Sequence, residues 1–86
     1  MRSAKVYFLR QHIGELVTVV NISELGNGTT MRGNWSFYPK IVDCNQFWLT
    51  LQGPNQEQQC FILRDVDITY SPAHKRLMLE ITTRQM

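Results

Sequence analysis

Short apolar runs with a period of two dominate the hydrophobic pattern of this chain, and that period is typical of β-strands. Apolar residues alternate with polar ones over 47–52, and a second strand segment follows at 58–63, with an apolar run from Cys60 to Leu63. Between these runs, residues 53–57 include Gly, Pro and Asn, which favour turns. The alternation changes phase at 64–65 and continues over 66–70. We therefore predict two strands joined by a turn, followed by a third strand after a bend.

Two earlier strands are predicted upstream of this region. Residues 15–23 are dense in β-branched side chains and are largely apolar on both faces, which favours a central place in a sheet. A tight turn at 26–28 leads into an alternating strand over 29–38. Gly33 weakens the middle of that strand, so it is expected to mark a sharp bend or a bulge.

The two ends of the chain are predicted as a helix and a strand. Apolar residues within 3–13 recur at the i, i+3 and i+7 positions of one helical face, and the alternative is a strand over 5–9. Residues 40–46 are interpreted as a loop, and the alternation over 77–81 predicts a last strand. Five or six short strands separated by turns indicate a small barrel or roll.

Length and composition fit one soluble domain over residues 1–86, since 43% of the 86 residues are hydrophobic and 19% are charged. The formal net charge of +2 is too small to indicate a nucleic-acid binder by bulk electrostatics. No apolar stretch reaches the length of a membrane span, so no membrane partner is expected. Cys44 is expected in a loop and Cys60 as a packed small hydrophobe, both as reduced thiols of a cytoplasmic protein.

The sequence contains no recognisable catalytic or metal-binding constellation. His12 and His74 are far apart and have no further ligands near them in sequence. Asp65 and Asp67 are two carboxylates alone, and no Ser or Cys stands beside a base motif. We therefore expect a binding protein with no catalytic residues, no metal and no cofactor, rather than an enzyme.

The order of these segments resembles the Sm-like family, which includes the bacterial RNA chaperone Hfq. Residues 8–19 are similar to the helix end and first strand of that family, and Gly28 and Gly33 are similar to its two second-strand glycines. Residues 45–51 resemble the loop and third strand of the first Sm motif, and residues 63–68 resemble the second motif.

The resemblance implies a mainly β fold, in which a short N-terminal helix precedes a strongly bent five-stranded barrel of SH3-like or Sm-like shape, with an extra C-terminal strand. It also implies a homo-oligomeric ring in which the fourth strand of each subunit, 58–63, pairs with the fifth strand of its neighbour, 66–70. Such pairing would cover the open edges of a small barrel. The implied function is non-catalytic binding of single-stranded RNA.

Five residues are the candidates for RNA contact: Asn45, Gln46, Phe47, Arg64 and Asp65. The amides suit hydrogen bonds to a base and Phe47 suits stacking, although Phe47 shares its face with core leucines and has the core as its alternative. Arg64 suits a phosphate or a base, with an ion pair to Asp65 or Asp67 as its alternative. Asp65 stands where the family usually has glycine, and a carboxylate there would repel phosphate.

The alternative function is a protein–protein interaction module with an SH3-like barrel and no nucleic-acid role. Tyr38 and Trp48 alternate away from the predicted core face, and with the loop 39–45 they form a candidate partner surface. Three basic residues near the predicted helix, Arg2, Lys5 and Arg10, are interpreted as a solvated helix face or as contacts to a nucleic-acid backbone.

Overall fold

The computed structural model describes residues 4–71 and 76–84 of the chain. Within those residues it contains one short α-helix and seven strands, which confirms the prediction of a mainly β fold with an N-terminal helix. The elements are, in chain order, α1 (Ala4–Arg10), β1 (Thr18–Glu24), β2 (Thr30–Asn34), β3 (Lys40–Cys44), β4 (Trp48–Gln52), β5 (Gln58–Ile62), the 3-10 turn η1 (Leu63–Asp65), β6 (Val66–Ser71) and β7 (Arg76–Arg84).

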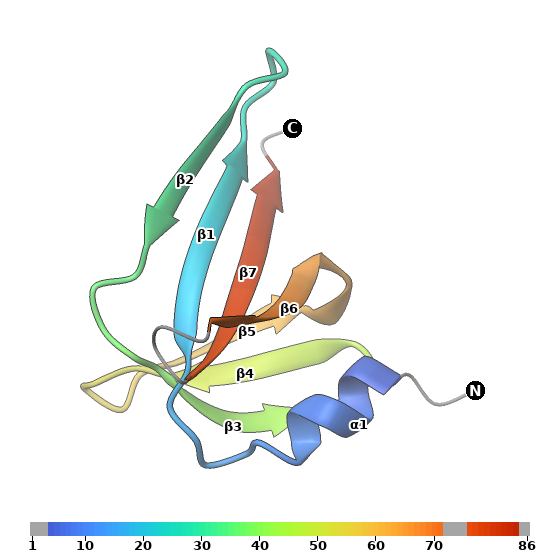
Figure 1. Cartoon of the computed structure of the whole chain (residues 1–86), viewed down its shortest axis with the longest axis vertical. Coiled ribbons are helices and arrows are strands. Elements are labelled where there is room, and N and C mark those ends of the chain that lie inside the picture. Colours follow the sequence, from blue (N-terminus) through green and yellow to red (C-terminus); the bar gives the residue numbers. More distant parts are fainter. Residues whose placement is uncertain (1–3, 72–75, 85–86) are drawn as a thin grey trace.

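The strands form two sheets, and the strands of one run across those of the other (Figure 1). The larger sheet has the order β2-β1-β7-β6, and the smaller has the order β3-β4-β5. β1 is central, as predicted, because it pairs with β2 on one side and in parallel with β7 on the other. The described residues do not form a closed barrel, since the chain bends at η1 and β5 and β6 belong to different sheets.

β7 corrects the prediction of five barrel strands with one extra strand appended at the C-terminal end. It lies inside the larger sheet, between β1 and β6, and its residues Leu79 and Ile81 are buried. These two side chains pack with Leu49 and Leu51 of β4 and with Val19 of β1 in a single core. Burying an aliphatic side chain stabilises the folded state by about 1.5–3 kcal/mol, so β7 is part of the stabilising core and not a peripheral addition.

The helix α1 confirms the helical interpretation of the N-terminal region and rules out the alternative strand over 5–9. It is shorter than predicted, and Leu9 is its buried residue, with Val6 packed against the same core. After the helix, Gly14 adopts a positive φ of 96°, which glycine tolerates, and its N–H donates to the carbonyl of Ile41 at 2.7 Å. The segment after α1 therefore runs along β3.

β3 was hidden by a bulge, and the prediction of a loop over 40–46 is wrong. Ile41 and Cys44 are buried, but they are three positions apart because the register with β4 shifts between Ile41 and Asp43. A bulge inserts one unpaired residue and so breaks the period of two. Of the two alternatives expected at Gly33, a sharp bend or a bulge, the bulge is absent, since β1 and β2 pair in unbroken register there.

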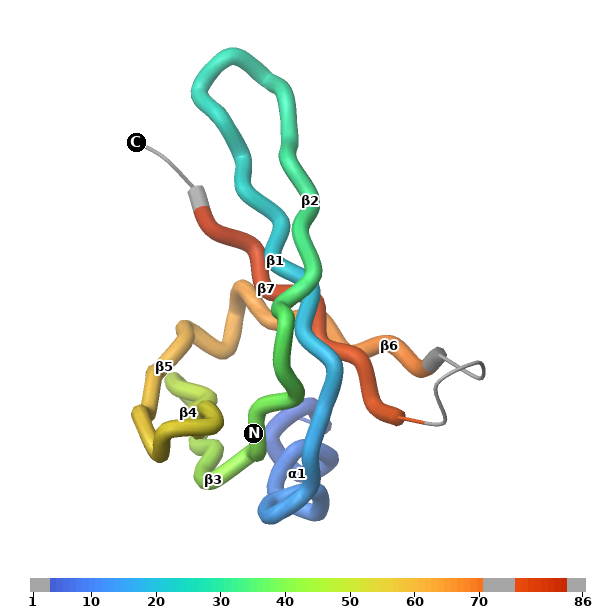
Figure 2. The backbone as a smooth tube through the Cα atoms, turned by 90° about the vertical axis from the view of Figure 1, so that its left-hand side faces the viewer, coloured from blue at the N-terminus to red at the C-terminus, as the bar shows by residue number. Residues whose placement is uncertain are grey.

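The β1–β2 hairpin projects away from α1 and from the smaller sheet (Figures 1 and 2). Its turn is the one predicted at 26–28, with Gly28 at a φ of 84° and the N–H of Leu25 bonded to the carbonyl of Thr29 at 2.9 Å. β2 ends at Asn34 instead of continuing to residue 38, and all five of its residues are exposed. Within the described residues, no helix is long and apolar enough to span a membrane.

Candidate functional site

Two surface regions bring together residues that are distant in sequence. The first, which we call the corner, consists of residues 45–48 before and at the start of β4 and residues 62–65 at the end of β5 and in η1. A backbone hydrogen bond from Leu63 N to the Phe47 carbonyl, 2.9 Å long, joins the two segments. Trp48 is also the register partner of Ile62. The corner therefore unites the predicted loop residues with the predicted Arg64 and Asp65.

Asn45 closes the turn that forms the first half of the corner. Its Oδ1 accepts hydrogen bonds from the backbone N–H groups of Phe47 and Trp48, both at 2.8 Å, and its own N–H donates to the Trp48 carbonyl at 2.9 Å. An Asn side chain bonded to the backbone two residues on is typical of an Asx turn. The side chain of Asn45 thus stabilises the turn, a role that the sequence did not reveal. Asn45 and Gln46 are both exposed residues, and the Asn45 NH2 group is a donor that the turn does not use.

Phe47 is 62% exposed, so the interpretation that it packs in the core is wrong. Its backbone is held at both ends, by Asn45 on the N–H and by Leu63 on the carbonyl, which directs the residue outside the alternation of β4. The side chain of Arg64 is 79% exposed, one residue beyond Leu63. The corner therefore presents an aromatic ring and a guanidinium on adjacent segments.

Asp65 differs from Arg64, because only 18% of its side chain is exposed. Its Oδ1 lies 3.9 Å from Arg64 Nε, which agrees with the ion pair expected as the alternative role of Arg64. At that distance and with Arg64 largely in solvent, the pair contributes little to stability. The carboxylate is mostly covered by the protein and is partly neutralised by the guanidinium beside it, which reduces the repulsion of phosphate expected from the sequence.

Two cationic side chains of α1, Lys5 and Arg10, donate hydrogen bonds to backbone carbonyls in or next to the corner. Lys5 Nζ donates to the carbonyls of Leu63 at 3.2 Å and Val66 at 2.6 Å. Arg10 Nη1 donates to the Cys44 carbonyl at 2.6 Å, beside Asp43. These contacts satisfy carbonyls at the turn and add positive charge beneath it. Neither role could be recognised from the helical pattern alone, which indicated only a solvated face or a nucleic-acid contact. Arg2, the third cation of that prediction, lies outside the described residues.

The two cysteines exchange the environments expected for them. Cys44 is buried in β3, and Cys60 is exposed on β5; both are free thiols. Burial raises the pKa of the Cys44 thiol, and the neighbouring Arg10 opposes that rise while Asp43 adds to it. The expectation failed because the bulge in β3 conceals Cys44, and because the outer face of β5 is left uncovered.

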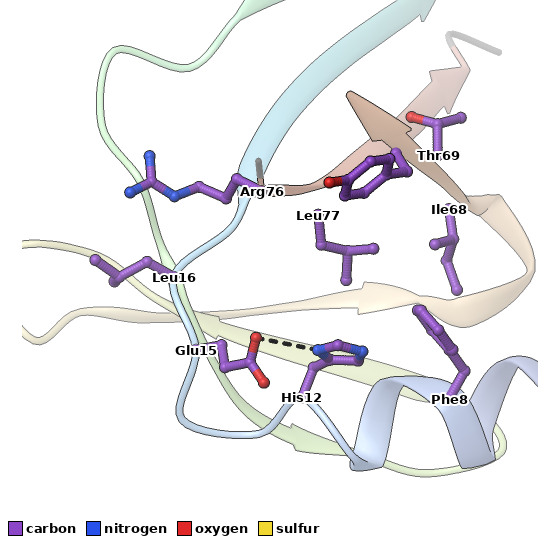
Figure 3. Close-up of a pocket in the computed structure, with 9 residues that line it drawn as sticks. Phe8, His12, Glu15, Leu16, Ile68, Thr69, Arg76 and Leu77 are labelled. Atoms are coloured by element: carbon purple, nitrogen blue, oxygen red, sulfur yellow. Dashed lines mark ion pairs between the residues drawn. The ribbon is translucent and has the colours of Figure 1, made fainter. Parts of the chain in front are cut away.

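The second region, which we call the groove, is a cavity of about 700 Å³ between α1 and the β6–β7 pair. In Figure 3, Phe8 of α1 and His12 of the turn after it face Ile68 and Leu77 across the groove. The His12 ring lies 4.7 Å from the Phe8 ring, and its Nδ1 is 3.1 Å from Glu15 Oε1. The residues that line the groove are Phe8, His12, Glu15, Leu16, Ile68, Thr69, Tyr70, Arg76 and Leu77.

Tyr38 and Trp48 are both exposed, as expected, but they lie at opposite ends of the smaller sheet. Lys40, two residues after Tyr38, pairs with Gln52, and about 13 Å of extended strand separates Gln52 from Trp48. The Tyr38 ring instead carries the guanidinium of Arg76, 4.1 Å from its centroid, at the margin of the groove. Trp48 therefore belongs to the corner and Tyr38 to the groove, rather than to one partner surface.

No group of three or more His, Cys, Asp or Glu side chains is arranged for a metal ion in residues 4–71 and 76–84. His12 is paired with Glu15, and His74 lies outside the described residues. Comparisons with protein-family models, with curated proteins and with solved structures found no match to this chain. The functional argument therefore rests on the corner and the groove themselves.

Proposed function

We propose that this chain is a non-catalytic, cytoplasmic RNA-binding protein of Sm-like type, which assembles into a homo-oligomeric ring and binds single-stranded RNA at the corner. One observation carries the proposal: exposed Phe47 and exposed Arg64 belong to neighbouring segments, because Leu63, the residue before Arg64, donates its N–H to the Phe47 carbonyl. Single-stranded RNA is recognised by stacking of unpaired bases on aromatic rings and arginine planes. The corner offers both groups on its two hydrogen-bonded segments.

The polar groups of the corner complement these two side chains. The Asn45 NH2 group and the amide of Gln46 supply donors and acceptors for a base edge. Arg64 supplies the charge for a phosphate, and Lys5 adds positive charge behind the backbone of η1. The partial burial of Asp65 keeps its carboxylate away from the ligand.

The ring is supported by the edges of the two sheets. β5 and β6 are the last strands of their sheets, so each has one edge that is unpaired within the described chain. β5 contains no charged residue, glycine or proline, which are the usual devices that protect an edge from pairing. Pairing β5 of one subunit with β6 of the next is a head-to-tail contact, which closes into a ring when the rotation allows. Because Ile68 and Tyr70 of β6 line the groove, such a contact would also cover it.

Fluorescence anisotropy with U-rich and A-rich oligonucleotides tests RNA binding, and native mass spectrometry tests the ring. We expect salt-sensitive binding that Arg64→Ala weakens without changing the assembly mass. Arg32→Ala is the matched control, since Arg32 is an exposed cation on β2 that pairs with Glu80 away from the corner. Absence of salt-sensitive binding at micromolar protein would refute the RNA function, and a monomeric mass would refute the ring.

The groove favours a second candidate function, a protein–protein interaction module. Its walls are mainly apolar, and its volume of about 700 Å³ is within the range of sites that bury a ligand side chain or a small molecule. Tyr38 and Arg76 form its polar margin. Retention of RNA binding in Arg64→Ala, together with loss of a partner protein in Leu16→Asp, would favour this function over the first.

A further inference from the structure

The outer face of the smaller sheet is a separate exposed surface that begins at the corner. Alternate residues of β4 point inward and are buried, as Leu49 and Leu51 show. The residues between them, such as Trp48 and Gln52, point to the other side, where none of the described residues buries them. Their register partners on β5, Ile62 and Gln58, are exposed on the same face.

We propose that this outer face is a second contact surface for the single-stranded RNA, over which the strand runs from Arg64 at the corner to Lys40 at the far end. The inference rests on the proposed RNA function and extends it from a single-base site to a track. Trp48 is the second stacking residue, Gln52 and Gln58 contact base edges, and Lys40 binds a phosphate.

The aromatic residues bracket the start of β4. Phe47 and Trp48 are consecutive, so in an extended chain they lie on opposite sides of the strand, and both are exposed. Trp48 stands beside the exposed Ile62, which widens the apolar platform. Stacking on such a platform tolerates any base, because every base has an aromatic face. An RNA strand with one base stacked on Phe47 can therefore pass over the end of β4 and stack its next base on Trp48.

The far half of the face is polar. Gln52 is opposite Gln58 on β5 and opposite Lys40 on β3, so two side-chain amides and one ammonium form a row across the three strands. Amides offer both donors and acceptors to base edges, and the ammonium suits a phosphate. Between this row and Trp48 lies Thr50, whose hydroxyl is 3.4 Å from Cys60 Sγ.

The charges on this face favour a polyanion over a protein partner. Arg64 and Lys40 stand at its two ends, and Asp43, the acidic residue of β3, lies 3.8 Å from Arg10. The large apolar side chains are confined to the end at Trp48, whereas a protein interface has an apolar centre and a polar rim. The face spans about 13 Å from Trp48 to Gln52, which is longer than one nucleotide and shorter than a protein epitope.

The test compares a short U-rich oligonucleotide, which reaches only Phe47 and Arg64 of the corner, with a longer one that also reaches Trp48 and Lys40, using the assembled protein and fluorescence anisotropy. Lys40→Ala should weaken binding of the longer oligonucleotide and lower its salt slope by about one, with no effect on the short one. Lys40→Arg should restore the slope, and Arg32→Ala on β2 should change neither. Trp48→Ala should weaken the longer oligonucleotide about fivefold or more.

The contact with Trp48 can also be tested with Trp48 in place, by measuring its fluorescence in a Trp35→Phe background. The longer oligonucleotide should quench this fluorescence and the short one should not. Unchanged binding of the longer oligonucleotide in Lys40→Ala and Trp48→Ala, with binding lost in Arg64→Ala, overturns this inference and leaves the corner intact. Failure of wild-type protein to bind either oligonucleotide overturns the corner as well. The inference is supported if Lys40→Ala and Trp48→Ala weaken binding of the longer oligonucleotide and leave binding of the short one unchanged.

Discussion

The corner and the groove are built from opposite kinds of interaction, although α1 borders both. The corner is held by backbone hydrogen bonds to Asn45 and Leu63 and by the side chain of Lys5, which leaves its aromatic ring and its guanidinium exposed. The groove is lined mainly by apolar side chains, and at one end of it His12 Nδ1 lies 3.1 Å from Glu15 Oε1 without a hydrogen-bond partner among the described residues.

The difference indicates different partners for the two regions. A site with pre-positioned polar groups and an exposed ring suits a charged ligand with aromatic faces. An apolar cavity beside an open strand edge suits a polypeptide, since only a backbone satisfies the N–H and C=O groups of that edge. In our proposals the corner binds RNA and the groove is covered by a second copy, so substitutions should separate the two activities.

Leu9→Ala should have the largest effect, because it should damage both regions together. Leu9 is the buried residue of α1, and the helix supplies one wall of the groove and the cations of the corner. Truncating a buried leucine costs about 2–5 kcal/mol of unfolding free energy. Urea denaturation measures this loss, with the exposed Tyr7→Ala on the same helix as the control. Equal stability of the two variants would show that α1 does not anchor the core.

Tyr70→Glu should separate the groove from the corner by abolishing assembly. Tyr70 is 65% exposed in the single chain and lines the groove, so the fold should tolerate the change. When a second copy covers the groove, the new carboxylate is buried without a partner, which costs several kcal/mol, on the order of a hundredfold in association. Light scattering measures the mass, with Tyr7→Glu as the control at 63% exposure. An unchanged mass contradicts the groove as a subunit contact.

Phe47→Ala should produce the reverse result. Loss of one stacking residue should weaken RNA binding by about 1–3 kcal/mol, while the assembly mass stays the same. Phe8→Ala is the matched variant, because it removes a phenyl ring from the groove and should alter assembly instead of RNA affinity. Anisotropy and light scattering on both variants complete the comparison. Equal RNA affinities of the two variants would remove Phe47 from the site.

Asn45→Ala should have a smaller effect, confined to the corner. The substitution removes the acceptor for the N–H groups of Phe47 and Trp48 and should cost about 1–2 kcal/mol of unfolding free energy. Asn45→Asp keeps that acceptor and adds negative charge, so it should preserve stability and weaken RNA binding. If Asn45→Asp destabilised the protein as much as Asn45→Ala, the Asx turn would not account for the role of Asn45.

The parts of the fold that follow a regular alternation could be predicted from the sequence. β1, β4 and β6 were found at nearly their observed positions, and the change of phase at 64–65 corresponds to η1. β3 could not be predicted, because its bulge places two buried residues three positions apart. The order of strands was also inaccessible, since the place of β7 between β1 and β6 depends on pairings between residues about 60 positions apart in sequence.

The sequence predicted which residues meet at the candidate site, but not the structural role of each residue. The segments with Asn45, Phe47 and Arg64 do meet, yet the duty of Asn45 as a turn acceptor and the exposure of Phe47 depend on backbone bonds that a pattern does not contain. The groove was missed because its lining comes from α1, the segment after it and the β6–β7 pair. Each of those segments has an unremarkable pattern, and only their packing forms a cavity.

Cys44 and Cys60 provide the finest test, because the structure reverses their predicted environments. Maleimide should label exposed Cys60 in the native protein and should label Cys44 only as the chain unfolds, since Cys44 is 1% exposed.

Burial raises the pKa of the Cys44 thiol, so the native state holds this proton more tightly than the unfolded state. The contribution to stability is therefore complete below the unfolded thiol pKa and declines as pH rises through it toward the folded pKa. Urea denaturation at neutral and alkaline pH should show a smaller alkaline loss in Cys44→Ala than in wild type, with Cys60→Ala like wild type. Native labelling of Cys44 as fast as Cys60 would show that β3 does not cover it.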